Sequence, residues 1–166
     1  MKQDQITENN ITYEIIENYL GHKFWYLNGK IHRENGPAIE YYNGSKEWYK
    51  NGKRYREDGP TVECANGTKY WHKNGKLHRD DGPAIECFDS TKEWYKNGKL
   101  HRDDGPAVES FDGSKEWYKN GKQHRENGPA SEYVNGNNRY WYNGKQIKNI
   151  KTDEELKRYI KLYSIS

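Results

Sequence analysis

The sequence is poor in the aliphatic residues that fill the core of an ordinary globular domain. Hydrophobic residues occupy 31% of its 166 positions, and phenylalanine occurs only 3 times. Such a composition, taken alone, is typical of disorder. Two features oppose disorder: the formal net charge is only +3, and 15 tyrosines with 6 tryptophans supply large apolar side chains. We therefore expect a thin aromatic core that is shared along an extended fold.

The chain also lacks an excess of charge of either sign and any long apolar run. Its 28 basic residues nearly balance 25 acidic ones, whereas a nucleic-acid-binding protein usually carries a clear basic stripe. No stretch approaches the roughly 18 apolar residues of a transmembrane helix. No apolar segment follows Met1, as a secretory signal would require. The sequence therefore predicts a soluble, cytoplasmic protein without a nucleic-acid partner.

Proline and cysteine are scarce, and both follow one period. The prolines recur every 23 residues, at Pro37, Pro60, Pro83, Pro106 and Pro129. The tryptophans keep this spacing until a one-residue slip before the last, and they are Trp25, Trp48, Trp71, Trp94, Trp117 and Trp141. A fixed period of this length is the signature of a repeat array. Cys64 and Cys87 occupy one place in adjacent units, and cytoplasmic thiols are expected to stay reduced.

Each unit contains two turn signals between short aromatic and β-branched runs, a pattern that predicts hairpins. Around Trp94 these signals are Asp89-Ser90 and Asn97-Gly98. Two-residue loops at both places put Ile85 opposite Trp94, and Glu93 opposite Arg102. That register predicts an Ile-Trp-His face, which forms the shared core, and a Tyr-Arg-Glu face on the other side. The fold class is therefore all-β: an elongated repeat array of antiparallel β-hairpins.

The ends of the chain differ from the repeats. Residues 1–10 carry no repeat and are predicted to be a flexible tail. Residues 11–147 form the repeat domain of about five units with partial units at its ends. In residues 148–166, Thr152 and Glu155 form a capping-box pattern, which predicts a short α-helix that caps the last sheet edge. The apolar face expected for this helix is Leu156, Tyr159, Ile160 and Tyr163.

The pattern Trp-Tyr-x-Asn-Gly-Lys-x-His-Arg-x-x-Gly-Pro-Ala, complete from Trp94 to Ala107, resembles a MORN (membrane occupation and recognition nexus) repeat. It is similar to the variant found in repeat proteins of giant viruses, large phages and some bacteria, and the resemblance covers roughly residues 16–147. It implies a MORN-like sheet of hairpins. For a viral protein, the intracellular location predicted above means the cytoplasm of an infected host cell.

Periodic residues argue against a catalytic centre or a metal site. The histidines share one slot, which Tyr55 takes in the second unit, and zinc needs three or four convergent ligands. That slot holds His32, His78, His101 and His124. Glutamate pairs recur with arginine alongside, so none has the asymmetric environment that acid–base catalysis requires. The sequence therefore predicts no enzyme, no catalytic residue, no metal and no cofactor.

The function predicted is a scaffold that binds a protein partner through an extended β surface. Aromatic and arginine side chains carry most interface energy, so the candidate binding residues are Tyr49, Tyr95, Tyr118, Arg56, Arg102 and Arg125. The tyrosines could instead only shield the second face of the sheet. The predicted structural core is the set of six tryptophans. The alternative functions are a ligand-sequestering or membrane-surface-associating module and, less favoured, a glycan-acting enzyme.

Overall fold

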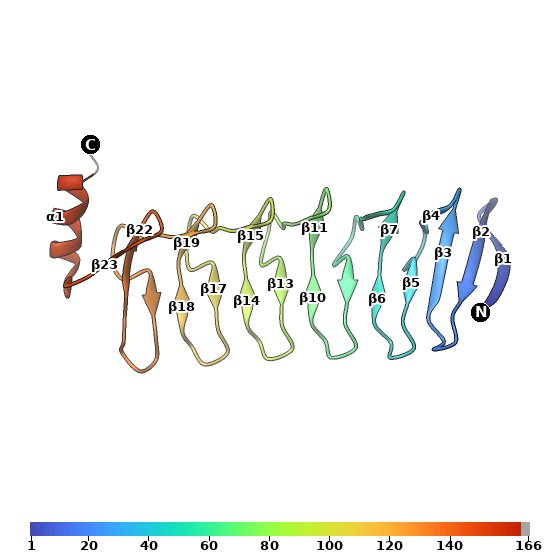
Figure 1. Cartoon of the computed structure of the whole chain (residues 1–166), viewed down its shortest axis with the longest axis horizontal. Coiled ribbons are helices and arrows are strands. Elements are labelled where there is room, and N and C mark those ends of the chain that lie inside the picture. Colours follow the sequence, from blue (N-terminus) through green and yellow to red (C-terminus); the bar gives the residue numbers. More distant parts are fainter. Residues whose placement is uncertain (164–166) are drawn as a thin grey trace.

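The computed structural model describes residues 1–163 and shows an elongated array of antiparallel β-hairpins (Figure 1). One 13-stranded sheet runs along the array, and after its first strands each of its members is only two residues long. Its strands are β1 (Lys2–Glu8), β2 (Ile11–Glu17), β3 (Lys23–Leu27), β4 (Lys30–Ile31), β5 (Ile39–Glu40), β6 (Lys46–Glu47), β9 (Val62–Glu63), β10 (Lys69–Tyr70), β13 (Ile85–Glu86), β14 (Lys92–Glu93), β17 (Val108–Glu109), β18 (Lys115–Glu116) and β21 (Ser131–Glu132). The predicted fold class is confirmed.

Five two-stranded hairpins line one long edge of this sheet, the upper edge in Figure 1. They are β7 (Tyr49–Lys50) with β8 (Lys53–Arg54), β11 (His72–Lys73) with β12 (Lys76–Leu77), β15 (Tyr95–Lys96) with β16 (Lys99–Leu100), β19 (Tyr118–Lys119) with β20 (Lys122–Gln123), and β22 (Tyr140–Tyr142) with β23 (Lys145–Ile147). We call this side the hairpin edge. The opposite side, where loops join the long-sheet strands, is the loop edge.

The Asn-Gly turns at the hairpin edge form as predicted. Tyr95 pairs with Leu100, so the loop has two residues, and both have positive φ: 54° at Asn97 and 80° at Gly98. This is the type I′ turn that Asn-Gly favours. The Gly98 N–H donates to the carbonyl of Leu77 in the preceding hairpin at 2.8 Å, so neighbouring hairpins are bonded to each other.

The predicted two-residue turn at the loop edge is wrong. Ile85 pairs with Glu93 instead of Trp94, because the loop contains three residues, 88–90. Ser90 adopts φ 73°, and the Asp89 carboxylate accepts the N–H of Thr91 at 2.9 Å. A type I turn closed by a residue in the left-handed region is the usual three-residue hairpin loop. The register therefore differs by one residue from the prediction.

This shift changes which side chains share a face, because neighbours along a strand point to opposite sides. Ile85 and Glu93 form one pair, and Tyr95 follows on the same side. Trp94 lies on the other side, where Arg102 stacks on its ring. The predicted Ile-Trp-His and Tyr-Arg-Glu faces are thus corrected to a Trp–Arg face and a Tyr–Glu face, each named for the residues that its units repeat.

The core is thin, as the composition indicates. The residue that follows the proline of each unit is enclosed. It is a fully buried alanine in four units and Thr61, which is 1% exposed, in the third unit. The enclosed alanines are Ala38, Ala84, Ala107 and Ala130. At the N-terminal end Tyr13, Ile15 and Trp25 form the main cluster of large buried side chains. Small residues let the backbones of this flat array approach closely.

Residues 1–10 are not a flexible tail, and that prediction is corrected. Strand β1 pairs along its whole length with β2, from Lys2 opposite Glu17 to Glu8 opposite Ile11. The turn between them is Asn9-Asn10, and both residues have positive φ, 50° and 64°. Because asparagine tolerates the left-handed region, this pair replaces the Asn-Gly of the other hairpins. Glu8 then reaches Arg33 of the first unit at 2.7 Å.

Helix α1 (Asp153–Tyr163) lies at the C-terminal end of the array, beyond β22 and β23 (Figure 1). The predicted capping box is confirmed: the Glu155 N–H donates to Thr152 Oγ1 at 3.3 Å, and the Thr152 N–H donates to Glu155 Oε2 at 3.2 Å. Leu156 is fully buried. The side chain of Tyr163 and residues 164–166 of the predicted cap lie outside the described part. No helix in the described chain is long and apolar enough to cross a membrane.

Candidate functional surfaces

The Trp–Arg face repeats one stacked pair in five units. The Arg102 guanidinium lies 4.0 Å from the centroid of the Trp94 ring, and the other units give between 3.7 and 4.3 Å. The other pairs are Arg33 with Trp25, Arg56 with Trp48, Arg79 with Trp71 and Arg125 with Trp117. A guanidinium over an indole face combines a cation–π attraction with coverage of the apolar ring.

The same arginine explains the Gly-Pro of every unit. In the unit of Trp94, Arg102 Nη1 donates to the carbonyl of Pro106 at 3.2 Å and to Glu109 Oε1 at 2.9 Å. A Cβ on Gly105 would lie 3.0 Å from the Arg102 Cζ, a tight contact that would force the guanidinium to shift. Glycine therefore favours the path of the guanidinium across the loop. The His-Arg-x-x-Gly-Pro motif thus describes one closed local structure.

The histidine slot links each unit to the next. His78 Nδ1 accepts the backbone N–H of Asn97 at 3.1 Å, and its Nε2 lies 2.8 Å from Asp80. These contacts fit a neutral ring with its proton on Nε2. The equivalent histidines of three other units repeat the bond to the following asparagine. They are His32, His101 and His124. Each histidine ring thus connects its unit to the next through a hydrogen bond, which is a structural role.

On the Tyr–Glu face, each candidate binding tyrosine bonds to a glutamate two residues earlier. Tyr95 donates its hydroxyl to Glu93 at 2.9 Å. The same bond joins Tyr49 to Glu47 and Tyr118 to Glu116, at 2.9 and 2.8 Å. Burial, first, and then the bond to the carboxylate raise the pKa of Tyr95 to about 12. The pKa of Tyr118 is raised for the same reasons.

The raised pKa values of these tyrosines predict that the folded protein loses stability at alkaline pH. Tyrosine ionises near pH 10 in an unfolded chain, so the folded protein, in which the pKa of Tyr95 is about 12, holds this proton more tightly. The stabilisation is complete below pH 10 and is lost as pH rises towards 12. We expect a Tyr95→Phe/Tyr118→Phe variant to lose less stability than wild type between pH 9.5 and about 11.5.

The measurement is urea denaturation across this pH range, with Tyr42→Phe as the control because Tyr42 is 75% exposed. Lysine ionises in the same range in all three proteins, so the difference between variant and wild type isolates the tyrosines. Equal pH slopes for the double variant and wild type would contradict the role of the hydroxyls.

The third unit departs from the others in a coupled way. His72 stands in the tyrosine slot and Thr61 in the alanine slot, and the Thr61 hydroxyl lies 2.7 Å from His72 Nδ1. Thr61 Oγ1 also donates to the carbonyl of Tyr70 at 3.1 Å. Desolvation, the larger cause, and the nearby Arg54 lower the pKa of His72. Thr61 and His72, which stand where the other units have alanine and tyrosine, thus keep their buried polar atoms hydrogen-bonded.

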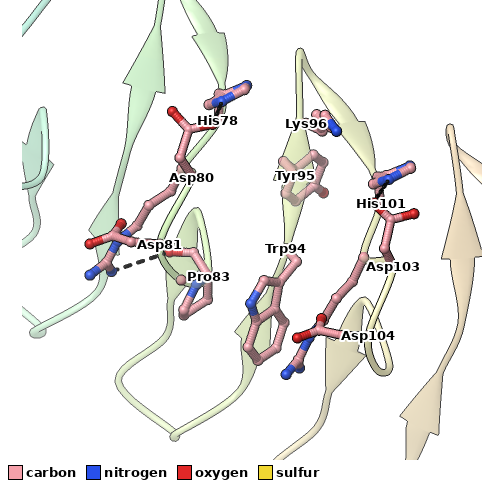
Figure 2. A pocket seen from close by; sticks show the side chains of 13 residues that line it. His78, Asp80, Asp81, Pro83, Trp94, Tyr95, Lys96, His101, Asp103 and Asp104 are labelled. Carbon is pink, nitrogen blue, oxygen red and sulfur yellow. Dashed lines mark hydrogen bonds and ion pairs between the residues drawn. The ribbon is translucent and has the colours of Figure 1, made fainter.

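Grooves recur along the Trp–Arg face, one between the acidic loop of each unit and the strand of the next. The groove in Figure 2 has a volume of about 510 Å³, and Asp80 and Asp81 line it on one side, Asp103 and Asp104 on the other. Trp94 stands between them. The next groove along the chain, of about 440 Å³, has Asp103 and Asp104 on one side, Glu126 and Asn127 at the equivalent places on the other, and Trp117 in the place of Trp94. Bonds to Lys73, first, and His78 hold the pKa of Asp80 at about 2.

The structure gives the predicted binding residues different partners. Tyr49, Tyr95 and Tyr118 bond to glutamates on the Tyr–Glu face, whereas the three arginines stack on tryptophans of the Trp–Arg face. Tyr95 and Arg102 nevertheless line one groove, and Tyr118 and Arg125 line the next. These arginines are Arg56, Arg102 and Arg125. Among the predicted core residues Trp25 is buried, at 5% exposure, and the other five tryptophans are partly exposed. They are Trp48, Trp71, Trp94, Trp117 and Trp141.

The chemistry of these surfaces is periodic throughout. Over the described residues, no group of three or more His, Cys, Asp or Glu side chains is placed to hold a metal ion. Cys64 and Cys87 are free thiols whose pKa is raised by burial. Each stacked arginine pairs with the glutamate seven residues later, and this ion pair returns in all five units.

Fold and surfaces together define a class: a β-hairpin repeat protein whose units are closed by a stacked Trp–Arg pair and joined by backbone and histidine bonds. No protein-family model matches the chain, and no curated protein matches it either. The class therefore rests on the repeated geometry itself.

Proposed function

We propose that this chain is a non-enzymatic, MORN-like scaffold that binds a protein partner along the grooves of its Trp–Arg face. The observation that carries the proposal is the recurrence of one groove, with equivalent lining, between successive units. A rigid array that repeats one recess offers a partner several equal contacts, and repeat proteins bind through such extended surfaces. We place this function in the cytoplasm, where the two free thiols stay reduced.

The aspartates that line the grooves suit recognition because their side chains are exposed and yet held in place by hydrogen bonds. The side chain of Asp81 is 81% exposed and that of Asp104 is 84% exposed. Both accept a bond from an arginine that is stacked on tryptophan, so each carboxylate has a fixed place. A side chain that is ordered before binding loses little entropy when it is contacted.

The test is quantitative capture of binding proteins by the whole chain and by an Asp81→Lys/Asp104→Lys variant. We expect the variant to lose at least tenfold of the captured partner, because charge reversal on both sides of the groove in Figure 2 opposes the original contact. Asp4→Lys/Glu154→Lys is the matched control, since it reverses two exposed charges outside the grooves. Equal thermal stability must first be shown for all three proteins.

Two results would reject the proposal. One is that the wild-type chain retains no protein above a scrambled-sequence bait. The other is that the groove variant and the control retain the same partner to the same extent, which would move binding away from the grooves.

A further inference from the structure

The turns of the hairpin edge carry a row of free lysines that the whole-chain charge balance conceals. The residue after each Asn-Gly turn is a lysine, and its side chain is exposed in all six cases. These residues, the lysine ladder, are Lys30, Lys53, Lys76, Lys99, Lys122 and Lys145. None of their ammonium groups has an ion pair among the described residues.

The ladder is ordered by contacts between units. Lys76 Cβ would lie 3.5 Å from a Cβ placed on Gly98, and its Cγ and Cδ follow the same path within 3.8 Å. Lys99 lies in the same way over Gly121, at 3.5 Å. Lys122 lies over Gly144 at 3.4 Å, so the aliphatic stems of three successive ladder lysines rest on the turn of the next unit, while their exposed ammonium groups remain in water.

The spacing of this line follows from the sheet. Each unit adds two strands to the long sheet, so successive ladder lysines are about 9.4–9.8 Å apart. A polypeptide in the polyproline II conformation advances about 9.3 Å per turn of three residues. A carboxylate at every third position of such a segment therefore meets one lysine per unit, and the small mismatch is within the reach of the flexible stem.

We infer that the lysine ladder binds an extended acidic segment of a partner protein, with one Asp or Glu per three residues. Charge density decides against nucleic acid: duplex DNA carries about one charge per 1.7 Å of axis, against one free lysine per unit here. A bilayer surface fits poorly because the exposed apolar side chains of the loops lie on the opposite edge. They are Tyr42, Phe88, Phe111 and Val134. This surface is separate from the proposed grooves.

The test measures binding of the whole chain to a fluorescent peptide of six Glu-Pro-Pro repeats by anisotropy at 50 mM salt. We expect Lys76→Gln/Lys99→Gln/Lys122→Gln to weaken binding roughly tenfold, since three exposed charge contacts are lost. Lys46→Gln/Lys69→Gln/Lys92→Gln is the matched control, because it removes the same charge from exposed lysines of the long sheet. We expect it to change affinity less than about twofold, and 500 mM salt to abolish binding.

Four outcomes overturn the inference. They are the absence of peptide binding at 50 mM salt, equal loss in the two triple variants, equal affinity for a peptide with its six glutamates in one block, and tighter binding of a 15-base-pair DNA duplex than of the peptide. Because purified chain and a defined peptide are used, this test can fail while groove-dependent capture succeeds, and the reverse.

Discussion

Replacement of Trp94 by alanine is expected to lower the free energy of unfolding by about 3 kcal/mol, near the lower end for removal of a large aromatic side chain. The indole is only half-buried, but it carries the Arg102 guanidinium at 4.0 Å and lies in the middle of the array. The backbone N–H of Trp94 donates to the Ala107 carbonyl at 2.8 Å, so the residue lies beside the fully enclosed Ala107. Urea denaturation followed by circular dichroism measures the change.

Phe111→Ala is the matched control, because that ring is 72% exposed on the loop edge and should change stability by less than about 0.5 kcal/mol. A double-mutant cycle with Arg102→Met should give a coupling energy with Trp94 of about 1 kcal/mol. An unchanged urea midpoint for Trp94→Ala, or strictly additive effects in the cycle, would show that the stacked pair does not close the unit.

Introduction of threonine at Ala84 is expected to cost about 2 kcal/mol, because a fully enclosed site receives two extra heavy atoms. The third unit indicates the compensation: there Thr61 is accepted beside His72, which replaces the tyrosine. In the fourth unit Tyr95 occupies that place and bonds to Glu93. Added bulk at Ala84 pushes this ring away from its carboxylate.

The compensating change is Tyr95→His in the Ala84→Thr protein. We expect the double variant to be about 1 kcal/mol more stable than the sum of the two single losses, because the new hydroxyl gains the imidazole as a partner. Chemical denaturation of the four proteins measures this. If the two losses in stability simply add, the Thr61 and His72 substitutions of the third unit are energetically independent and do not compensate each other.

The period, the hairpin-edge turns and the helix cap could be predicted because their signals are local. Asn97-Gly98 requires only the preference of these two residues for positive φ, and Thr152 with Glu155 requires only a reciprocal bond at a helix start. The loop-edge turn was ambiguous, since Asp89-Ser90 is compatible with loops of two or three residues. One residue of difference there exchanged the partners of Ile85 and reversed the face of Trp94.

The stacking of Arg102 on Trp94 depends on the register set by the loop-edge turn. It could not be predicted because the predicted register was wrong by one residue. A local signal for it was nevertheless present: an arginine stands three residues before the glycine of every Gly-Pro. Gly105 gives room to the Arg102 guanidinium that crosses it, and the equivalent Gly59 and Gly128 also have positive φ, 146° and 116°. The amino-acid type alone does not distinguish a glycine of this kind from a turn glycine, so the arginine contact of the Gly-Pro could not be read from the motif.

The last unit has the same length as the others, but its tryptophan stands one position later: Tyr140 takes the place of Trp117, and Trp141 takes the place of Tyr118. The loop-edge turn is kept, since the Gly136 N–H donates to the Tyr133 carbonyl as the Gly113 N–H donates to that of Ser110. The isolated bridge from Ser131 to Arg139 repeats the Val108–Glu116 pair, and Tyr140 to Tyr142 pair with β23. An exchange of two neighbouring residues, without insertion or deletion, thus changes which aromatic ring a unit presents at a given position. Aromatic residues can therefore be rearranged between the faces of this array while the strand register stays the same.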